Sequence, residues 1–402
     1  DYGSSNTGKL KTLYRSGLGI RYGRRMQTIA GLHYNLSFGD DLFAAWQAQT
    51  PNAQDLTLTE FKNDKYLGLI RNFKRLTSLV LYLLGASPSV CPCFVSGIEH
   101  DLELLNDSTY YRPTATSLRM GKLGYTNSVQ EHLDIRYNNL PEYIKGLRRA
   151  IQTPHASFEK LGLDDADGNP IQINDHILQI ENEYYSPIRP KQIAMSGESP
   201  TEALERRGIA YVEFRAIDLD PYSDIGIRLS SACFLEVMAL YCLLSDSPEL
   251  MPAEEEALAV NVERVVNEGR RENLQIINNG DEQTLESWML MHLSRMQPLA
   301  ELLDAHYGGN EYRTAVALMQ GKAGHPESTI SAQVNSDSKR LGSLWQLGFT
   351  LAQQHRESIL QQTLSPNTQA KYEVLAEKSI LQQAELEAAE TEDFMEFLQQ
   401  YR

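Results

Sequence analysis

Residues 208–222, with the sequence GIAYVEFRAIDLDPY, predict the β-strand that decides the fold of this chain. Their side chains alternate between two faces, so Glu213 and Arg215 share one face while Phe214 lies on the other. A carboxylate and a guanidinium side by side at the centre of a strand need a physical reason. Either they neutralise each other, or they jointly hold a charged ligand, such as a metal ion with an anionic substrate.

A second alternating segment lies near the start of the chain. Residues 26–38 predict a strand that places His33, Asn35 and Ser37 on one face, with Gln27 continuing that face. A neutral imidazole beside a carboxylate can ligate a divalent cation. His33 and Glu213 would therefore share an ion if their two strands lie in one sheet, and a purely structural histidine is the alternative.

A third strand is predicted within residues 168–185, where Glu181 and Glu183 lie on one face. The sequence SPIRPKQ that follows predicts a loop. Its prolines stiffen the backbone and so aim the charges of Arg189 and Lys191, an arrangement that suits an anion such as a triphosphate. A solvated turn is the alternative.

Helical periodicity marks one long segment of the first half and most of the second half. Residues 57–84 predict a helix that stops at Gly85, with Pro88 just beyond. The later helical segments are 229–244, 253–267, 284–306, 311–320, 339–363 and 367–390. A sheet-rich core in residues 1–225 followed by mainly helical residues 226–402 predicts an α+β fold with an antiparallel or mixed sheet. No repeat or clean linker is present, so residues 1–402 are expected to form a single domain.

Composition and charge exclude several classes of protein. The 402 residues carry a net charge of −16, which repels the phosphates of nucleic acids and of membrane surfaces. No apolar run reaches the length of about 18 residues that spans a bilayer, so we predict a cytoplasmic protein with no membrane or nucleic-acid partner. Cys91, Cys93, Cys233 and Cys242 lack the spacing of a zinc site or a CxxC pair and are expected to be reduced.

Motifs of other enzyme classes are missing from the sequence. No GxSxG, HExxH or GxGxxG motif occurs in the right context, which argues against a nucleophilic hydrolase and against a dinucleotide enzyme. Strands with a charged face and a basic segment instead indicate metal-assisted phosphoryl chemistry.

Seven segments, in this order, resemble bacterial glutamate–cysteine ligase (gamma-glutamylcysteine synthetase), the first enzyme of glutathione synthesis. They are SSNTGKLKTLYRSGL, RYGRRMQTIAGLHYN, LLGASPSVC, TATSLRMGKLGYTN, LQIENEYYSPIRPK, SGESP and AYVEFRAIDLDPYS. The resemblance implies a fold similar to glutamine synthetase, in which a curved antiparallel sheet forms a funnel. It also implies ATP-dependent ligation of the γ-carboxylate of L-glutamate to the amine of L-cysteine through γ-glutamyl phosphate, with Mg²⁺, or alternatively Mn²⁺, as the metal.

The resemblance also implies roles for individual residues. His33 and Glu213 match metal ligands of the family, and Arg215 matches a catalytic arginine near the transferring phosphate and the glutamyl carboxylate. Arg189 and Lys191 are implied as phosphate contacts. The residues implied around the cysteine and glutamate pockets are Tyr14, Leu18, Gln27, Arg119, Tyr125 and Tyr185.

One departure from the family concerns the metal site. Family members carry an N-terminal segment before the SNTG motif, with a Glu-x-Glu strand whose glutamates complete the metal cluster. The sequence contains no such segment, and Glu181 and Glu183 are not expected to replace it. Part of the Mg²⁺ site is therefore expected either on a separate N-terminal fragment or nowhere, which would make the chain an incomplete enzyme. The alternatives are a non-catalytic or regulatory remnant and a related carboxylate–amine ligase with another acceptor.

Overall fold

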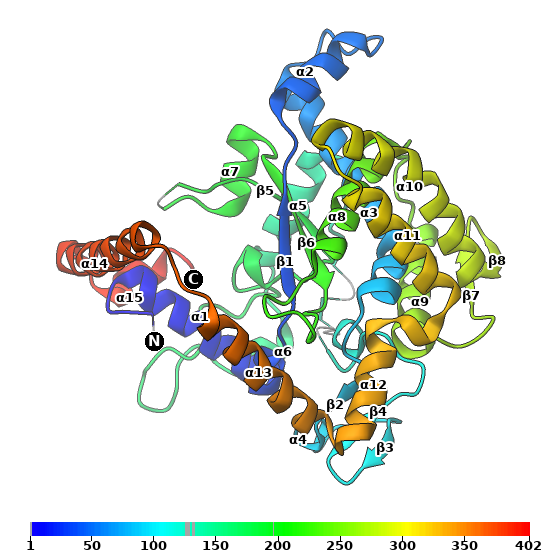
Figure 1. Cartoon of the computed structure of the whole chain (residues 1–402). Coiled ribbons are helices and arrows are strands. Elements are labelled where there is room, and N and C mark those ends of the chain that lie inside the picture. Colours follow the sequence, from blue (N-terminus) through cyan, green and yellow to red (C-terminus); the bar gives the residue numbers. More distant parts are fainter. Residues whose placement is uncertain (1, 125–128, 131–132, 196) are drawn as a thin grey trace. The chain divides into compact units, whose positions relative to one another are not determined.

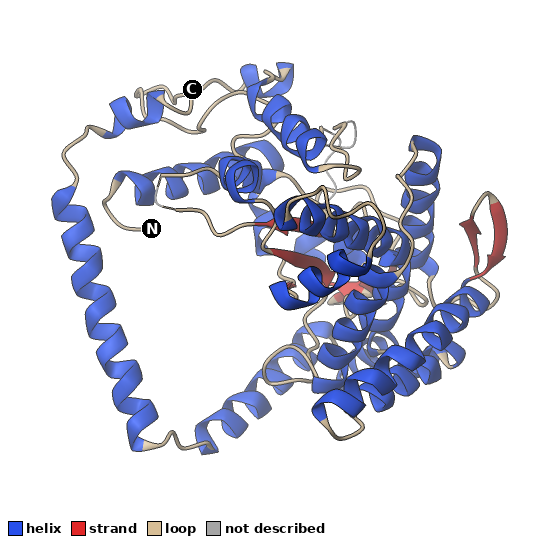
Figure 2. Cartoon of the chain, turned by 90° about the horizontal axis from the view of Figure 1, so that it is seen from above, coloured by secondary structure: helices blue, strands red, loops and turns tan. Residues whose placement is uncertain are grey.

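The computed structural model describes residues 2–124, 129–130, 133–195 and 197–402, and helices predominate in it (Figure 2). The chain divides into two compact units. The first unit comprises Asp1–Thr28, Arg149–Tyr184 and Gln354–Arg402, and the second comprises Ile29–Arg148 and Tyr185–Gln353. The units interleave along the sequence and do not divide at residue 225, so the single catalytic domain stays a prediction.

The first unit is built on α1 and on the C-terminal helices. Its elements are α1 (Asn6–Tyr22), η1 (Arg24–Thr28), α6 (Ala156–Glu159), η3 (Glu181–Glu183), α14 (Pro366–Ala389) and α15 (Phe394–Gln399). Two helices, α5 (Leu140–Gln152) and α13 (Leu344–Gln361), begin in the second unit and end in the first. Ser5 caps α1 by accepting a hydrogen bond from the backbone N–H of Gly8. Leu13 on α1 joins a small core with Ile173 and Leu398.

The sheet that positions the site belongs to the second unit. It is antiparallel, and its strands are, in order, β1 (Leu32–Leu36), β6 (Tyr211–Ile217) and β5 (Ile188–Lys191). The strand predicted around Glu213 is confirmed and lies at the centre. Asn35 of β1 faces Glu213 on one side, and Arg189 of β5 faces it on the other. Because directly opposite residues share a face, both neighbours present side chains beside Glu213.

A long helix supports this sheet from behind. α3 (Leu58–Leu84) packs against β5 and β6, and the rings of Phe73 and Phe214 have centroids 4.8 Å apart. Thr57 and Glu60 form a capping box at the N-terminus of α3. The helix ends at Gly85 as predicted, where a Cβ atom would lie 2.3 Å from the backbone oxygen of Leu81.

The remaining elements of the second unit are mostly helical. α8 and α11 pack against α3, and α10 packs against α8 and α11 (Figure 1). The helices are α2 (Asp40–Gln49), α4 (Pro92–Val95), η2 (Leu118–Met120), α7 (Pro200–Arg207), α8 (Leu229–Leu244), α9 (Pro252–Glu268), α10 (Leu285–Tyr307), α11 (Glu311–Gly324), η4 (Pro326–Ser328) and α12 (Ile330–Leu341). The strands are β2 (Ser89–Val90), β3 (Glu103–Asn106), β4 (Thr109–Tyr111), β7 (Gln275–Asn278) and β8 (Asp281–Thr284). The fold is thus α+β as predicted, with small antiparallel sheets and less strand in residues 1–225 than expected.

The structure reverses the prediction for two adjacent segments. The strand expected within residues 168–185 is wrong, because η3 takes its place and its polar side chains bond to α1. The expected loop SPIRPKQ instead contains β5. Pro190 is tolerated there because β5 is an edge strand, and proline removes a donor that an edge strand does not need.

The first predicted strand is shorter than expected. β1 begins at Leu32, and Gln27 lies in the short helix η1 rather than on the strand. Within β1, His33 and Asn35 are exposed and alternate with half-buried residues, so these two share a face as predicted.

Among the described residues, no helix is both long enough and apolar enough to cross a membrane.

Candidate active site

Ionisable side chains gather around Glu213 on one face of the central sheet. Its carboxylate lies 3.1 Å from Nη1 of Arg215 and 3.9 Å from Nζ of Lys191. Nδ1 of His33 lies 3.4 Å from the other carboxylate oxygen. Arg189 is paired with Glu213 across β5 and β6. The structure therefore brings together five residues that came from three separate segments of the sequence.

Burial and neighbouring charges set the protonation of this cluster. Burial raises the pKa of Glu213, but the charges of Lys191 and Arg215 outweigh it and hold that pKa below its usual value. Burial lowers the pKa of Lys191 despite the attraction of Glu213. Burial and the charge of Arg215 lower the pKa of His33, so its imidazole is neutral near pH 7 and keeps a lone pair for a ligand.

The cluster as a whole carries more positive than negative charge. Arg189, Lys191 and Arg215 surround the single carboxylate of Glu213. Nε of Arg215 is buried and has no hydrogen-bond partner among the described residues. An unsatisfied buried donor costs about 1–3 kcal/mol, so this guanidinium is better stabilised when an anion lies beside it. The face therefore suits an anionic ligand, although the whole chain is acidic.

Two predicted substrate residues, Arg119 and Tyr185, border the cluster. Nη2 of Arg119 donates to the backbone oxygen of Arg215 at 3.3 Å. The guanidinium of Arg215 lies 5.9 Å from the ring centre of Tyr185. The hydroxyl of Tyr185 donates to Sδ of Met120 at 2.8 Å. Tyr125, which was predicted to join them, lies outside the described residues.

The other three predicted substrate residues belong to the first unit and are described there by themselves. Tyr14 and Leu18 lie four residues apart on α1, and so on the same side of that helix. Tyr14 packs against the small core around Leu13. Gln27 is exposed, and its side chain donates to the backbone oxygen of Arg15 at 3.0 Å.

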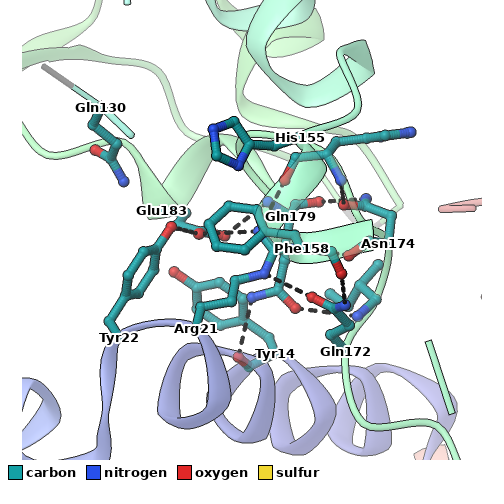
Figure 3. Close-up of polar contacts among 12 residues, drawn as sticks. Tyr14, Arg21, Tyr22, Gln130, His155, Phe158, Gln172, Asn174, Gln179 and Glu183 are labelled. Atoms are coloured by element: carbon teal, nitrogen blue, oxygen red, sulfur yellow. Dashed lines mark hydrogen bonds and ion pairs between the residues drawn. The ribbon is translucent and has the colours of Figure 1, made fainter. Parts of the chain in front are cut away.

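A buried network holds α1 to η3 and to the segment before it (Figure 3). Nε of Arg21 donates to Oε1 of Gln172 at 2.8 Å, and Nη1 lies 3.3 Å from Oε1 of Glu183. Glu183 also accepts from the hydroxyl of Tyr22 at 2.5 Å and from the backbone N–H of Gln179 at 2.7 Å. Both oxygens of Glu183 are thus engaged within the protein.

Sequence reasoning missed one buried carboxylate next to the cluster. Oδ1 of Asp218 lies 2.6 Å from Nε of Arg119, and both side chains are almost fully buried. The available signal was its place in the sequence, directly after the last apolar residue of β6. An acidic residue at the end of a buried strand requires a partner, because an unpaired buried charge is strongly destabilising.

The described residues contain no group of three or more His, Cys, Asp or Glu side chains arranged to hold a metal ion. His33 and Glu213 are the adjacent pair that the sequence predicted. Together with three cations on an antiparallel sheet, they form a charged cluster of a kind that suits phosphate or carboxylate groups.

Comparisons with known proteins show which family the chain is similar to. Residues 1–265 match the family model for glutamate–cysteine ligase. The glutamate–cysteine ligase of Alcanivorax borkumensis is 45% identical over 407 residues, covering 100% of this chain and 77% of that protein. The crystal structure of glutamate–cysteine ligase from Francisella tularensis in complex with AMP gives a TM-score of 0.91 at 33% identity, covering 100% of this chain and 78% of that one. A bifunctional glutathione synthetase from Pasteurella multocida shares the fold, with a TM-score of 0.65 at 23% identity over 85% of this chain and 38% of its own.

The chain belongs to the glutamate–cysteine ligase family. Its function is the ligation that begins glutathione biosynthesis, and the resemblance inferred from seven sequence segments is confirmed.

Proposed function

We propose that the charged face of β6 binds the γ-phosphate of ATP and the γ-carboxylate of L-glutamate, with Arg215 as the catalytic residue between them. The observation that carries this proposal is the state of Arg215. Its guanidinium is mostly buried, one amino group contacts Glu213, and Nε lacks a partner among the described residues. A planar guanidinium matches two oxygens of a phosphate or carboxylate at once. The AMP bound to the Francisella tularensis relative supports a nucleotide as one of the ligands.

The proposed reaction has two steps. A γ-carboxylate oxygen of L-glutamate attacks the γ-phosphorus of ATP, and the bond to the bridging oxygen breaks to release ADP and form γ-glutamyl phosphate. The amine of L-cysteine then attacks the acyl carbon, loses a proton and expels phosphate, which leaves γ-glutamylcysteine. Arg215, with Arg189 and Lys191 as phosphate contacts, offsets the charge on the transferring group. Positioning and charge neutralisation are the main protein contributions to such transfers.

His33 and Glu213 fit part of a site for a divalent cation shared with the nucleotide, Mg²⁺ or alternatively Mn²⁺. A neutral imidazole and an ionised carboxylate stand 3.4 Å apart at His33 and Glu213. Mg²⁺ usually takes only one or two protein ligands and completes its shell with water and phosphate oxygens. When bound, the ion would neutralise phosphate charge. His33 and Glu213 would hold it, and Lys191 keeps Glu213 ionised.

We propose that the remaining predicted residues bind the amino-acid substrates. Arg119 and Tyr185 border Arg215 in the second unit. Arg119 would contact the carboxylate of an amino-acid substrate, and Tyr185 would contact the side chain of that substrate. Tyr14, Leu18 and Gln27 of the first unit, and Tyr125, are proposed from the family resemblance. The same resemblance supports a curved sheet forming a funnel, and both units as parts of one catalytic domain.

We also propose that the ligase works in the cytoplasm. Its four cysteines are all free. Free thiols suit the reducing environment inside a cell, because oxidising compartments favour disulfides.

Oxygen transfer tests the acyl-phosphate proposal. L-glutamate labelled with ¹⁸O in its γ-carboxylate is incubated with the ligase, ATP, Mg²⁺ and L-cysteine, and the phosphate formed is analysed by mass spectrometry. The proposal predicts one ¹⁸O atom per phosphate, because the carboxylate oxygen that attacked phosphorus leaves with it. Unlabelled phosphate would reject the γ-glutamyl phosphate. A parallel assay with L-alanine or L-serine in place of L-cysteine measures how far the acceptor is restricted.

A further inference from the structure

The carboxylate of Asp218 lies where three of the sequence motifs meet. It accepts hydrogen bonds from the backbone N–H of Ala86 at 2.7 Å and from the hydroxyl of Ser87 at 2.8 Å, both to Oδ2. Its Oδ1 accepts from the hydroxyl of Ser117 at 3.0 Å and from Nε of Arg119 at 2.6 Å. Ala86 and Ser87 come from LLGASPSVC, and Ser117 and Arg119 come from TATSLRMGKLGYTN.

This arrangement leaves Asp218 little freedom. Its side chain is 3% exposed and both oxygens hold two donors each. The backbone of Ser87 is also fixed, because its N–H donates to Thr116 and its oxygen accepts from Leu118. A carboxylate held from four sides acts as a rigid anchor, and charge-assisted hydrogen bonds are among the strongest in proteins.

Asp218 accepts a hydrogen bond from Nε of Arg119 and so determines where the rest of the guanidinium lies. Nη2 reaches the backbone oxygen of Arg215, on the strand that carries the proposed catalytic residue. Nη1 lies against Gly31, where an added Cβ atom would come within 2.5 Å of it. Asp218 on one side and the bare backbone of Gly31 on the other therefore confine one guanidinium.

We propose that Asp218 is a positioning residue, which orients the guanidinium of Arg119 toward the carboxylate of an amino-acid substrate. The proposal rests on the function proposed above for Arg119. On this proposal Asp218 of IDLDP holds Arg119 directly, and residues 86 and 87 of LLGASPSVC hold Asp218. These residues position Arg119 and do not contact the substrate. Gly31 has the complementary task of leaving room for that guanidinium.

The test compares Asp218→Asn with a matched control, Asp220→Asn. In Asp218→Asn one oxygen becomes an amide donor, which faces either Arg119 or the N–H and hydroxyl donors of residues 86 and 87. In either orientation the charge-assisted pair with Nε of Arg119 is lost, and the guanidinium is held less firmly. Asp220 is equally buried, and its carboxylate lies 2.6 Å from Nε of Arg228, away from Arg119. Both variants remove the charge of a buried carboxylate that is paired with an arginine, but only Asp218→Asn acts on Arg119, because Arg228 is partly exposed and bonds to Asp220 instead.

Steady-state KM values for L-glutamate, L-cysteine and ATP, with kcat, are measured for both variants and for Arg119→Ala. We expect Asp218→Asn to raise the KM of one amino acid at least 10-fold. The same KM should rise in Arg119→Ala, while the KM of ATP changes less than 2-fold. Asp220→Asn should leave all three KM values within 2-fold. A purely structural role for Asp218 would instead lower the unfolding temperature of both aspartate variants and leave their KM values alike.

Gly31→Ala keeps the test decisive if Asp218→Asn does not fold, because it displaces Nη1 while leaving the anchor intact. We expect it to raise the same KM. If Arg119→Ala raises a KM that neither Asp218→Asn nor Gly31→Ala affects, the positioning proposal is wrong while the role of Arg119 stands. If Arg119→Ala leaves every KM unchanged, the proposed role of Arg119 is wrong and the positioning proposal falls with it.

Discussion

Replacing Arg215 by lysine separates the charge of this residue from its geometry. Both side chains are cationic, but arginine presents several N–H donors in a flat fork, whereas lysine presents one compact ammonium. In the structure the nitrogens of Arg215 have different surroundings. Nη1 lies 3.1 Å from Glu213, and Nε is buried without a partner among the described residues. A lysine ammonium at the same place cannot serve Glu213 and a transferring phosphate together.

The size of the effect follows from the contacts that are lost. A hydrogen bond to a charged group contributes about 1.5–3 kcal/mol, and Arg215→Lys removes one or two of them from the transition state. A loss of about 3 kcal/mol corresponds to a fall in kcat/KM of roughly 100-fold. The charge beside Glu213 is kept, so we expect the unfolding temperature to change by only a few degrees.

The assay follows γ-glutamylcysteine and ADP in the same reaction, and circular dichroism follows thermal unfolding. Arg228→Lys is the matched control, because Arg228 pairs with Asp220 but is partly exposed and lies outside the proposed site. We expect its kcat/KM to remain within 2-fold of the parent. If Arg215→Lys retained more than a third of the parent kcat/KM while folding normally, Arg215 would not be the catalytic residue.

Three further predictions concern stability. Burial lowers the pKa of His292 to about 4, below its unfolded value near 6.5, so the stability due to its neutral form is complete above pH 6.5 and falls as the pH drops toward 4. We expect the free energy of unfolding to fall by at most about 2 kcal/mol between pH 7 and pH 5, as measured by urea unfolding at both pH values. This fall should be absent in His292→Gln. Glu183→Gln leaves the buried guanidinium of Arg21 without its counter-charge, so we expect the free energy of unfolding of the first unit to fall by about 3 kcal/mol. The rate of proteolysis of that unit measures this change, and a fall below about 1 kcal/mol would contradict a buried ion pair. Gly208→Ala places a Cβ at a φ of +71° and 2.6 Å from Oδ1 of Asn63, so it should cost more than about 1 kcal/mol in urea unfolding, whereas Gly348→Ala, with open space around it, should not.

Local pattern predicted some elements well because their causes are local. The alternation of residues 208–222 is a property of extended backbone, and it correctly placed Glu213 and Arg215 on one face of β6. The end of α3 at Gly85 was predicted because glycine with a nearby proline commonly terminates a helix, and the structure adds that a Cβ at this position would collide with the backbone oxygen of Leu81. Local pattern gave two wrong predictions within residues 168–191. The alternating segment before residue 185 is not a strand but bonds to α1, and the segment with two prolines is an edge strand rather than a loop.

In the candidate site, too, some residues could be found from the sequence and one could not. His33, Arg189, Lys191 and Arg215 were each selected from the sequence, partly by pattern and partly by family resemblance. Asp218 was not, because its importance depends on four donors that come from distant segments. The place of Asp218 at the end of β6 indicates that it needs a partner, but no local feature of IDLDP shows that this partner is Arg119.

The sequence by itself determined which residues alternate on β6, where α3 ends, and which family the chain belongs to. Only the tertiary structure decided that β1 and β5 flank β6 with Asn35 and Arg189 opposite Glu213, and that Asp218 grips Arg119. The physical reason is that backbone conformation depends on neighbours in the chain, whereas strand register and buried ion pairs depend on residues far apart in sequence. Those partners meet only when burying the apolar face of the sheet against α3 brings their segments together.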